Sequence, residues 1–168
     1  MSQSSTTLIC AFEVPPEADA EFLAGWERTP GAAVLYRALR SDVEFRFVVV
    51  GPAPVLVDAS FPSHPALYEV VHEQGEVDQP GGTVLINPFD VPPDDDGFLD
   101  VWHHAREALA REHGFLGARL YQSTEPTADF RFVEIARWSS PLMFARASAK
   151  TAYPGNPALY EVVPASSK

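Results

Sequence analysis

The chain is poor in cysteine and in positive charge. Its one cysteine, Cys10, cannot form a disulfide within the chain, which is typical of a cytoplasmic protein. Twelve lysines and arginines stand against 23 acidic residues, so the formal net charge is −11. Nucleic acids and anionic membrane surfaces attract clusters of basic residues, and this sequence has no such cluster. We therefore expect no nucleic-acid partner and no membrane partner.

Several patterns that indicate particular functions are also missing. No apolar run approaches the roughly 18 residues that span a bilayer, and no basic residue precedes the short apolar stretch near the N-terminus. The sequence contains no glycine-rich phosphate loop, no zinc-ligand spacing and no Ser-His-Asp pattern. We therefore expect neither a transmembrane helix nor a secretory signal, and no metal or bound cofactor. Hydrophobic residues make up 46% of the chain, which favours a folded globular protein.

The most informative feature that the chain does have is an internal repeat. Five features recur in the same order: FEVPP at 12–16 and FDVPP at 89–93, FLAGW at 22–26 and FLDVW at 98–102, Tyr36 and Tyr121, EFRFV at 44–48 and DFRFV at 129–133, and FPSHPALYEVV at 61–71 and YPGNPALYEVV at 153–163. This order predicts two copies of one unit. The first copy covers residues 6–75, the second covers residues 82–165, and a Gly/Pro linker joins them.

The second copy gives the fuller prediction of secondary structure. The expected elements are a strand at 83–91, an amphipathic helix from 94 to about 113, hairpin strands at 115–123 and 129–138, a helix from 140 to about 151, and a strand at 158–163. The order β-α-β-β-α-β is that of a ferredoxin-like unit, so the predicted fold class is α+β.

A ferredoxin-like unit covers one face of its sheet with helices and leaves the other face bare. The alternation in FRFVEIARW places Phe130, Phe132, Ala136 and Trp138 on one face, and Val133 and Ile135 on the other. Two copies can bury their bare faces against each other, which predicts an intrachain pseudo-dimeric α+β barrel. The alternative is two separate units, each marginal in stability because of its small size and uncovered sheet.

The two copies differ where a binding site would lie. The first copy is nine residues shorter between the matched tryptophan and the matched tyrosine. Pro52 stands where the second copy has Arg137, and Cys10 stands where it has Asn87. These differences predict that the first copy is structural and that the second copy holds the site.

The second copy also resembles a known family. INPFDVPP, FLDVW, HGFLGARLY and FRFVEIARWSSPLMF, within residues 83–163, are similar to the antibiotic biosynthesis monooxygenase family, which has the dimeric α+β barrel fold. The resemblance implies a monooxygenase that oxidises an anthrone-like or quinol-like aromatic polyketide with molecular oxygen and no cofactor. It leaves two alternatives open: a non-oxidative polyketide cyclase, isomerase or ligand-binding protein, and a haem-binding or haem-degrading protein.

The resemblance also implies two catalytic residues, Asn87 on the first strand and Trp138 at the end of the third strand. Asn87 could donate a hydrogen bond to a phenolate or peroxide oxygen, and Trp138 could stack on an aromatic ring. The histidine of the haem-degrading branch has no counterpart at the matching place, which weighs against haem. The expected partners are a small hydrophobic aromatic substrate and molecular oxygen, while a homodimer remains open.

Five further residues are expected to bind the substrate: Trp102, Phe132, Tyr121, Arg137 and His113. Four of them also have a structural explanation. Trp102 and Tyr121 are matched in the first copy, which favours a shared packing role. Arg137 could be a surface charge at a strand end, and His113 could favour the negative end of a helix dipole.

Overall fold

The computed structural model describes residues 6–27, 33–52, 60–77, 82–143 and 157–164. The strands are β1 (Thr7–Phe12), β2 (Val34–Ala38), β3 (Phe47–Pro52), β4 (Ser63–Gly75), β5 (Thr83–Phe89), β6 (Phe115–Ser123), β7 (Phe132–Trp138) and β8 (Ala158–Val162). The helices are α1 (Asp19–Glu27), preceded by the 3-10 turn η1 (Pro16–Ala18), and α2 (Phe98–Leu109). Within the described ranges, no helix has the length and apolar character needed to cross a membrane.

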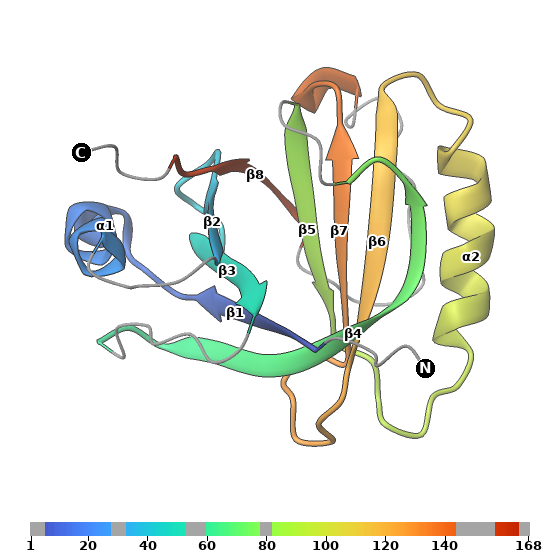
Figure 1. Ribbon diagram of the computed structural model, residues 1–168, viewed down its shortest axis with the longest axis horizontal. Helices are drawn as coiled ribbons and strands as arrows, with labels where there is room; N and C mark the ends of the chain where they lie inside the picture. Colours follow the sequence, from blue (N-terminus) through green and yellow to red (C-terminus); the bar gives the residue numbers. More distant parts are fainter. Residues whose placement is uncertain (1–5, 28–32, 53–59, 78–81, 144–156, 165–168) are drawn as a thin grey trace.

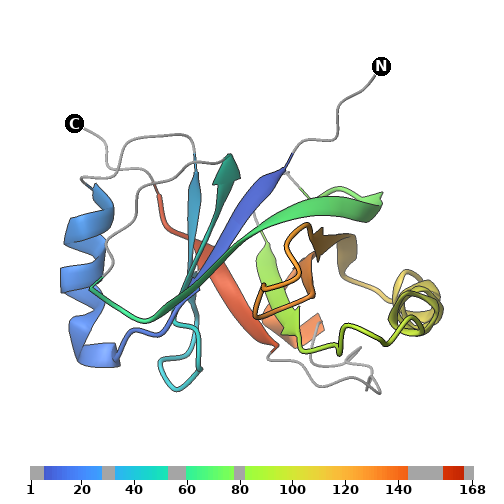
Figure 2. The same cartoon turned by 90° about the horizontal axis from the view of Figure 1, so that it is seen from below.

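The eight strands close into an antiparallel barrel in the order β1-β3-β2-β8-β5-β7-β6-β4 (Figure 1). Residues 7–75, here called the first half, supply the neighbouring strands β4-β1-β3-β2. Residues 83–162, the second half, supply β8-β5-β7-β6. The halves join where β2 pairs with β8 and where β4 pairs with β6. Figure 2 shows α1 outside the first half and α2 outside the second, which confirms the predicted α+β fold.

Alternate side chains of the strands point into the barrel and out toward the helices. The interior core contains Ile9, Ala11, Val48, Ala66, Tyr68, Val84, Ile86, Tyr121, Val133, Ile135 and Tyr160, among others. On β7 the predicted alternation is confirmed, because Phe132, Ala136 and Trp138 belong to clusters on the helix side. Phe130 was assigned to the wrong face: it packs against the interior core, since β7 begins only at Phe132.

Two equivalent tyrosines link the halves reciprocally. The hydroxyl of Tyr68 in the first half donates a hydrogen bond of 2.9 Å to the carbonyl of Phe130 in the second. The hydroxyl of Tyr160 in the second half donates one of 2.6 Å to the carbonyl of Phe45 in the first. The rings of Phe45 and Phe130 meet edge to face at 5.4 Å. The same sequence positions therefore fasten each half to the other.

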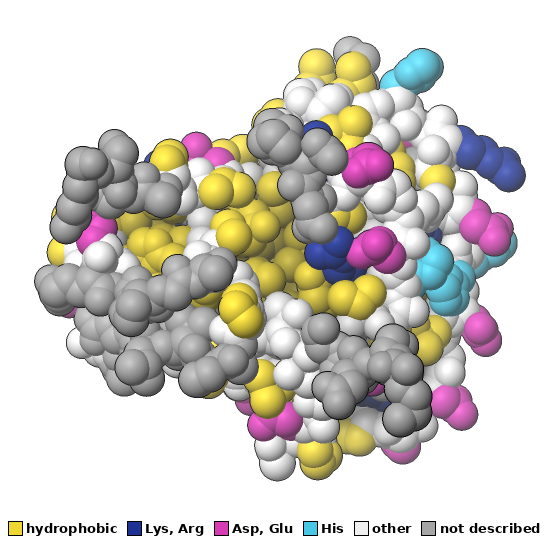
Figure 3. All heavy atoms as spheres, in the orientation of Figure 1, with side chains coloured by type: hydrophobic (Ala, Val, Ile, Leu, Met, Phe, Trp, Pro, Cys, Tyr) yellow, Lys and Arg dark blue, Asp and Glu magenta, His cyan; other side chains and the backbone are white. Residues whose placement is uncertain are grey.

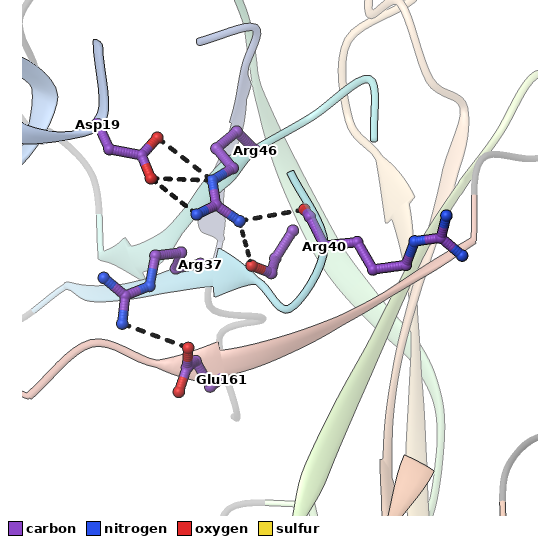
Figure 4. Close-up of polar contacts among 6 residues, drawn as sticks. Asp19, Arg37, Arg40, Arg46 and Glu161 are labelled. Atoms are coloured by element: carbon purple, nitrogen blue, oxygen red, sulfur yellow. Dashed lines mark hydrogen bonds and ion pairs between the residues drawn. The ribbon is translucent and has the colours of Figure 1, made fainter. Parts of the chain in front are cut away.

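Arginines tie the outer elements of the first half to the sheet (Figure 4). Arg46 binds the carboxylate of Asp19 at the start of α1, with the closest pair of atoms 2.7 Å apart, and also donates to the carbonyl of Ala38. Arg37 on β2 reaches Glu161 on β8 at 3.3 Å, across one of the two joints between the halves. These contacts fix α1 and close the barrel at that joint.

The predicted element limits hold best for strands. The strand predicted at 115–123 is confirmed, while β5 ends two residues early, at Phe89. The helix expected from residue 94 begins only at Phe98, because the side chain of Asp95 accepts a hydrogen bond from the backbone N–H of Gly97 and holds a turn. The helix predicted from residue 140 is present at 141–143, and the remainder of that prediction lies outside the described residues.

Candidate functional site

The candidate site lies in the layer between α2 and the second-half strands. Two apolar clusters occupy the outer face of these strands, and only the first of them includes residues of α2. One contains Phe89, Val91, Phe98, Trp102, Leu120 and Phe132, and the other contains Leu85, Ala118, Ala136 and Trp138. Asn87, Glu134 and Arg106 are buried polar residues of the same elements, and we call these three the polar belt. Along β5 and β7, Asn87 and Glu134 stand between the residues of the first cluster and those of the second, so the belt divides the two clusters.

The polar belt is built from three different elements. Asn87 on β5 and Glu134 on β7 are direct cross-strand partners, and the alternation of both strands turns them toward α2. Arg106 on α2 forms an ion pair with the carboxylate of Glu134. Glu134 is 2% exposed and Arg106 is 5% exposed, so solvent screens the pair very little. The centre of the Arg106 guanidinium also lies 5.2 Å from the Trp102 ring, within cation–π range.

The surroundings of the ion pair shift the pKa of both Glu134 and Arg106. Burial raises the pKa of Glu134, while the charge of Arg106 and hydrogen bonding from Trp102 and Arg106 act in the opposite direction without cancelling the rise. Burial lowers the pKa of Arg106, but a guanidinium begins so far above neutrality that it stays protonated. The belt therefore holds a carboxylate that accepts a proton more readily than an exposed glutamate, beside a fixed positive charge.

The belt also has hydrogen-bonding capacity left over. Among the described residues, Nε and Nη1 of Arg106 and Oδ1 of Asn87 are buried and have no hydrogen-bond partner. Buried polar atoms in folded proteins are nearly always bonded, and leaving one unbonded costs about 1–3 kcal/mol. Two unused donors on a cation and one unused acceptor are suited to a ligand that presents oxygen atoms and a hydroxyl group.

The matching layer of the first half has no such belt. Cys10 and Val49 stand at the positions of Asn87 and Glu134, and they are cross-strand partners in the same way. Both belong to one continuous apolar cluster against α1. Burial raises the pKa of the Cys10 thiol to about 11, so it stays neutral near pH 7. The fold can therefore be built at these positions with apolar side chains.

The structure brings three of the predicted site residues together. Asn87 belongs to the polar belt, and Trp102 and Phe132 form the apolar wall beside it, where Phe132 stacks on Phe98 at 4.4 Å. Trp138 lies in the other cluster of the same layer. It is fully buried and meets the ring of Phe115 edge to face at 5.4 Å. Its contacts in this conformation are those of a core side chain.

The other three predicted residues lie elsewhere. Tyr121 points into the barrel core and accepts a hydrogen bond of 3.3 Å from Arg119. Arg137 donates a hydrogen bond of 2.6 Å to the backbone carbonyl of Glu76. His113 is exposed beyond the end of α2. None of these three belongs to the two apolar clusters of the layer or to the polar belt.

Two belt residues were not predicted from the sequence, although a signal for them existed. Glu134 is a carboxylate on the stripe of β7 that otherwise carries Phe132, Ala136 and Trp138, which the alternation had already assigned to the buried face. Arg106 follows Trp102 by four residues, so it lies on the buried side of an amphipathic helix. A charge on each of two facing apolar stripes indicates a buried ion pair.

The first half contributes a histidine to the outer edge of the layer. His72 on β4 lies 4.9 Å from the Trp102 ring and 4.6 Å from the ring of His103, measured between centroids. Burial, followed by the proximity of His103 and Arg106, lowers the pKa of His72, so the ring is neutral near pH 7. Figure 3 shows histidine side chains gathered on the side of the molecule where α2 lies.

Two cavities among the described residues lie away from the polar belt. One of about 450 Å³ lies between the β6–β7 turn and the segment after β5, with Gln122, Glu125 and Arg131 in its lining. The other, of about 500 Å³, lies beside β8 and is lined by Leu39 and Leu159 among others. Neither cavity is lined by a belt residue or by Trp138. The three belt residues are buried, and neither of these cavities gives a ligand access to them.

Comparisons with known proteins agree with this architecture. Residues 83–151 match the family model described as antibiotic biosynthesis monooxygenase. An anthrone oxidase-like protein of solved structure is 13% identical, with a TM-score of 0.68, and the match covers 97% of this chain and 93% of that chain. A monooxygenase candidate from Fusobacterium nucleatum is also 13% identical, with a TM-score of 0.61 and coverage of 98% and 94%. At this identity both matches show the fold alone.

A monooxygenase candidate from Shewanella loihica PV-4 is more similar in sequence. It is 33% identical over 50% of this chain and 96% of that chain, with a TM-score of 0.47. Comparison with curated proteins gives no match. Through its residues 83–151, this chain belongs to the antibiotic biosynthesis monooxygenase family.

Proposed function

We propose that this chain is a monooxygenase that oxidises an anthrone-like or quinol-like aromatic polyketide with molecular oxygen and without a bound cofactor. For an anthrone, one oxygen atom becomes the new carbonyl of the ring, and the other leaves as water with the two hydrogens of the oxidised carbon. The observation that carries the proposal is the polar belt of the second half. Similarity of fold to an anthrone oxidase-like protein is consistent with it.

We also propose that the barrel is an intrachain pseudo-dimer of two ferredoxin-like repeats, residues 6–75 and 82–165. The identical strand order of the halves and the reciprocal bonds of Tyr68 and Tyr160 support this proposal. In this pseudo-dimer, the first repeat closes the barrel and supports the second repeat, which holds the site.

The chemistry follows from what oxygen needs. Molecular oxygen reacts with an electron-rich anion, so the protein must bind the ring away from water, remove a proton and stabilise the resulting negative charge. In the proposed site, the amide of Asn87 donates a hydrogen bond to a phenolate or peroxide oxygen. Trp102 and Phe132 form one apolar wall, and Trp138 closes the other end. Tyr121, Arg137 and His113 lie outside this site.

Entry of the substrate is part of the proposal. The layer is closed around the belt, so an incoming ring displaces α2 from the sheet and takes the place of side-chain contacts there. Closure of α2 over the bound ring then excludes water, which strengthens every electrostatic interaction inside.

The proposal is tested by oxygen uptake with an anthrone and with a dihydroquinone, each with and without reduced flavin. We expect uptake without flavin, and we expect Asn87→Ala to slow it by about 100-fold to 1000-fold, the range for loss of one charge-stabilising donor. The matched control is Cys10→Ala, at the same place in the first half. This control should keep the rate of the unmodified protein.

The outcomes separate the alternatives. No uptake with any of these substrates would favour the non-oxidative cyclase, isomerase or ligand-binding function. A Soret band on addition of haem would favour haem binding. Full activity in Asn87→Ala would place the chemistry outside the polar belt.

A further inference from the structure

Glu134 and Arg106 form a buried ion pair whose presence the fold does not explain. Val49 fills the position of Glu134 in the first half, is completely buried and belongs to a continuous apolar cluster. Replacing a buried ion pair by packed apolar residues is often neutral or stabilising. The second half therefore carries a pair that the same architecture does without, at a position where a charge is costly to bury.

We propose that Glu134 is the proton acceptor of the second half, and that Arg106 receives the oxygen anion which the proton transfer creates. The proposal rests on the proposed function and names the substrate property that it needs. The substrate is an aromatic ring with an acidic C–H or O–H whose conjugate base carries its charge on oxygen. An anthrone, whose methylene hydrogens are acidified by the ring carbonyl, has this property.

The step is balanced in atoms and in charge. A substrate C–H or O–H bond breaks, its hydrogen becomes the O–H of the Glu134 carboxyl group, and the electron pair stays on the substrate as an enolate or phenolate. Before the step, Arg106 faces a carboxylate, and afterwards it faces a carboxylic acid and an oxygen anion. One negative charge therefore lies beside the guanidinium throughout, and the buried layer gains no net charge.

The donors for the anion are already in place. Nε and Nη1 of Arg106 are buried and unbonded among the described residues, while another nitrogen, Nη2, faces Glu134. Charge-assisted hydrogen bonds of this kind are roughly twice as strong as those between neutral groups. Asn87 is directly opposite Glu134 across the two strands, and its unused Oδ1 can accept a hydrogen bond from a second hydroxyl of the ring.

The environment of Glu134 suits this task. Burial raises its pKa, and a base is most effective when its pKa lies closer to the working pH than that of an ordinary glutamate. The charge of Arg106 limits the rise, which favours the ionised carboxylate that acts as a base. The aromatic wall of Trp102 and Phe132 beside the pair supplies the apolar surroundings that a flat ring requires.

Proton transfer can be measured without oxygen. The protein is incubated anaerobically with an anthrone in D₂O, and loss of the methylene signal is followed by proton NMR against a protein-free sample. We expect the unmodified protein to accelerate exchange. Glu134→Gln keeps the size of the side chain and one acceptor oxygen for Arg106 but cannot take up the proton, and it should slow the catalysed exchange by about 100-fold or more. The acidic limb of the pH–rate profile, set by Glu134, should disappear with it.

A second variant separates the loss of proton exchange from a loss of folding. Glu134→Val with Arg106→Leu replaces both charges with apolar side chains, as Val49 does at the position of Glu134, so it should fold while losing exchange. Exchange in Glu134→Gln within about threefold of the unmodified protein would overturn the proposal. So would oxygen uptake by the unmodified protein without any accelerated exchange, or the absence of both. Accelerated exchange without oxygen uptake would uphold Glu134 as the proton acceptor and reject the proposed oxygenation.

Discussion

In the first half, the strands meet α1 through one continuous apolar cluster, whereas in the second half a polar belt divides the corresponding layer. The cross-strand pair Cys10 and Val49 becomes the pair Asn87 and Glu134. The backbone pairing is the same in both, so hydrogen bonding of the sheet does not require the change. The difference lies in the free energy of burial, which favours Val49 and opposes an isolated carboxylate by several kcal/mol.

This comparison separates residues that build the barrel from residues that it merely accommodates. Arg46 and Arg131 occupy matching positions and each fastens an outer segment to the sheet. Tyr68 and Tyr160 likewise make matching bonds. Matched residues with matched contacts are parts of the architecture. Glu134 differs from its counterpart in charge while it keeps the same burial, which is the pattern expected of a residue retained for chemistry.

The largest expected effect comes from Arg106→Leu. It leaves the buried carboxylate of Glu134 unpaired, which should lower the free energy of unfolding by about 3–5 kcal/mol at pH 8. Adding Glu134→Val removes the unpaired charge and places there the side chain that the first half has in Val49, so the double variant should return to within about 1 kcal/mol of the unmodified protein or exceed it. Urea denaturation measures both.

The control for this prediction is the pH dependence of the stability of the Arg106→Leu variant. Without Arg106, the pKa of Glu134 should rise further, since the positive charge that opposes the rise is gone. The carboxyl group then protonates as the pH falls, and the loss of stability should be smaller at pH 5 than at pH 8. A loss below about 1 kcal/mol at pH 8 would show that the pair is less isolated from solvent than its burial indicates.

The second prediction concerns the reciprocal tyrosines. Removing the hydroxyl in Tyr160→Phe leaves the carbonyl of Phe45 without this buried bond, and the free energy of unfolding should fall by about 1–1.5 kcal/mol. Tyr68→Phe breaks the partly buried equivalent and should lower it by about 0.5–1 kcal/mol. Denaturant titration of both variants and their combination measures the values. Losses of unrelated size would contradict equivalent roles for the two bonds.

Much of the fold could be predicted from the sequence because the repeat and the alternation report local packing. The alternation on β7 gave the correct face for Phe132, Ala136 and Trp138. The start of α2 was missed, since a cluster of acidic residues is compatible both with a first helical turn and with the turn that Asp95 holds. Helix limits depend on such single hydrogen bonds, whereas strand faces depend on a pattern repeated over many residues.

The candidate site could be predicted only in part. Asn87 and Trp102 lie in the layer, whereas Tyr121 and Arg137 alternate to the other face of β6 and β7 and His113 follows the end of α2. Glu134 and Arg106 are 28 positions apart in the sequence, and only the packing of α2 on β7 brings them into contact. Each charge lies on an apolar stripe, which indicates that it is buried, but no local spacing pattern shows that the two stripes face each other.

The smallest expected effect lies at His64, where the first half meets the second outside the layer. The ring bridges two carboxylates, Nδ1 to Asp129 at 2.7 Å and Nε2 to Glu13 at 2.8 Å. Burial alone would lower the pKa of His64, but the hydrogen bonds and charges of Asp129 and Glu13 outweigh burial and raise it. Both ring nitrogens can donate only when the imidazole is protonated. The bridge between the halves therefore depends on that proton.

A raised pKa in the folded state fixes the sign of the pH effect. The stabilisation is fully present below the unfolded-state value of about 6.5 and is lost as the pH rises through the higher folded-state pKa. Solvent reaches all three groups, so the loss should stay below about 1 kcal/mol. Melting curves of the unmodified protein and of His64→Gln, from pH 5.5 to 9, measure it. The melting temperatures of the two proteins should differ most at pH 5.5–6 and converge at high pH, because only the histidine loses its bridge there. A constant difference across that range would show that the ring contributes by packing against Phe45 and Phe130 and not by its charge.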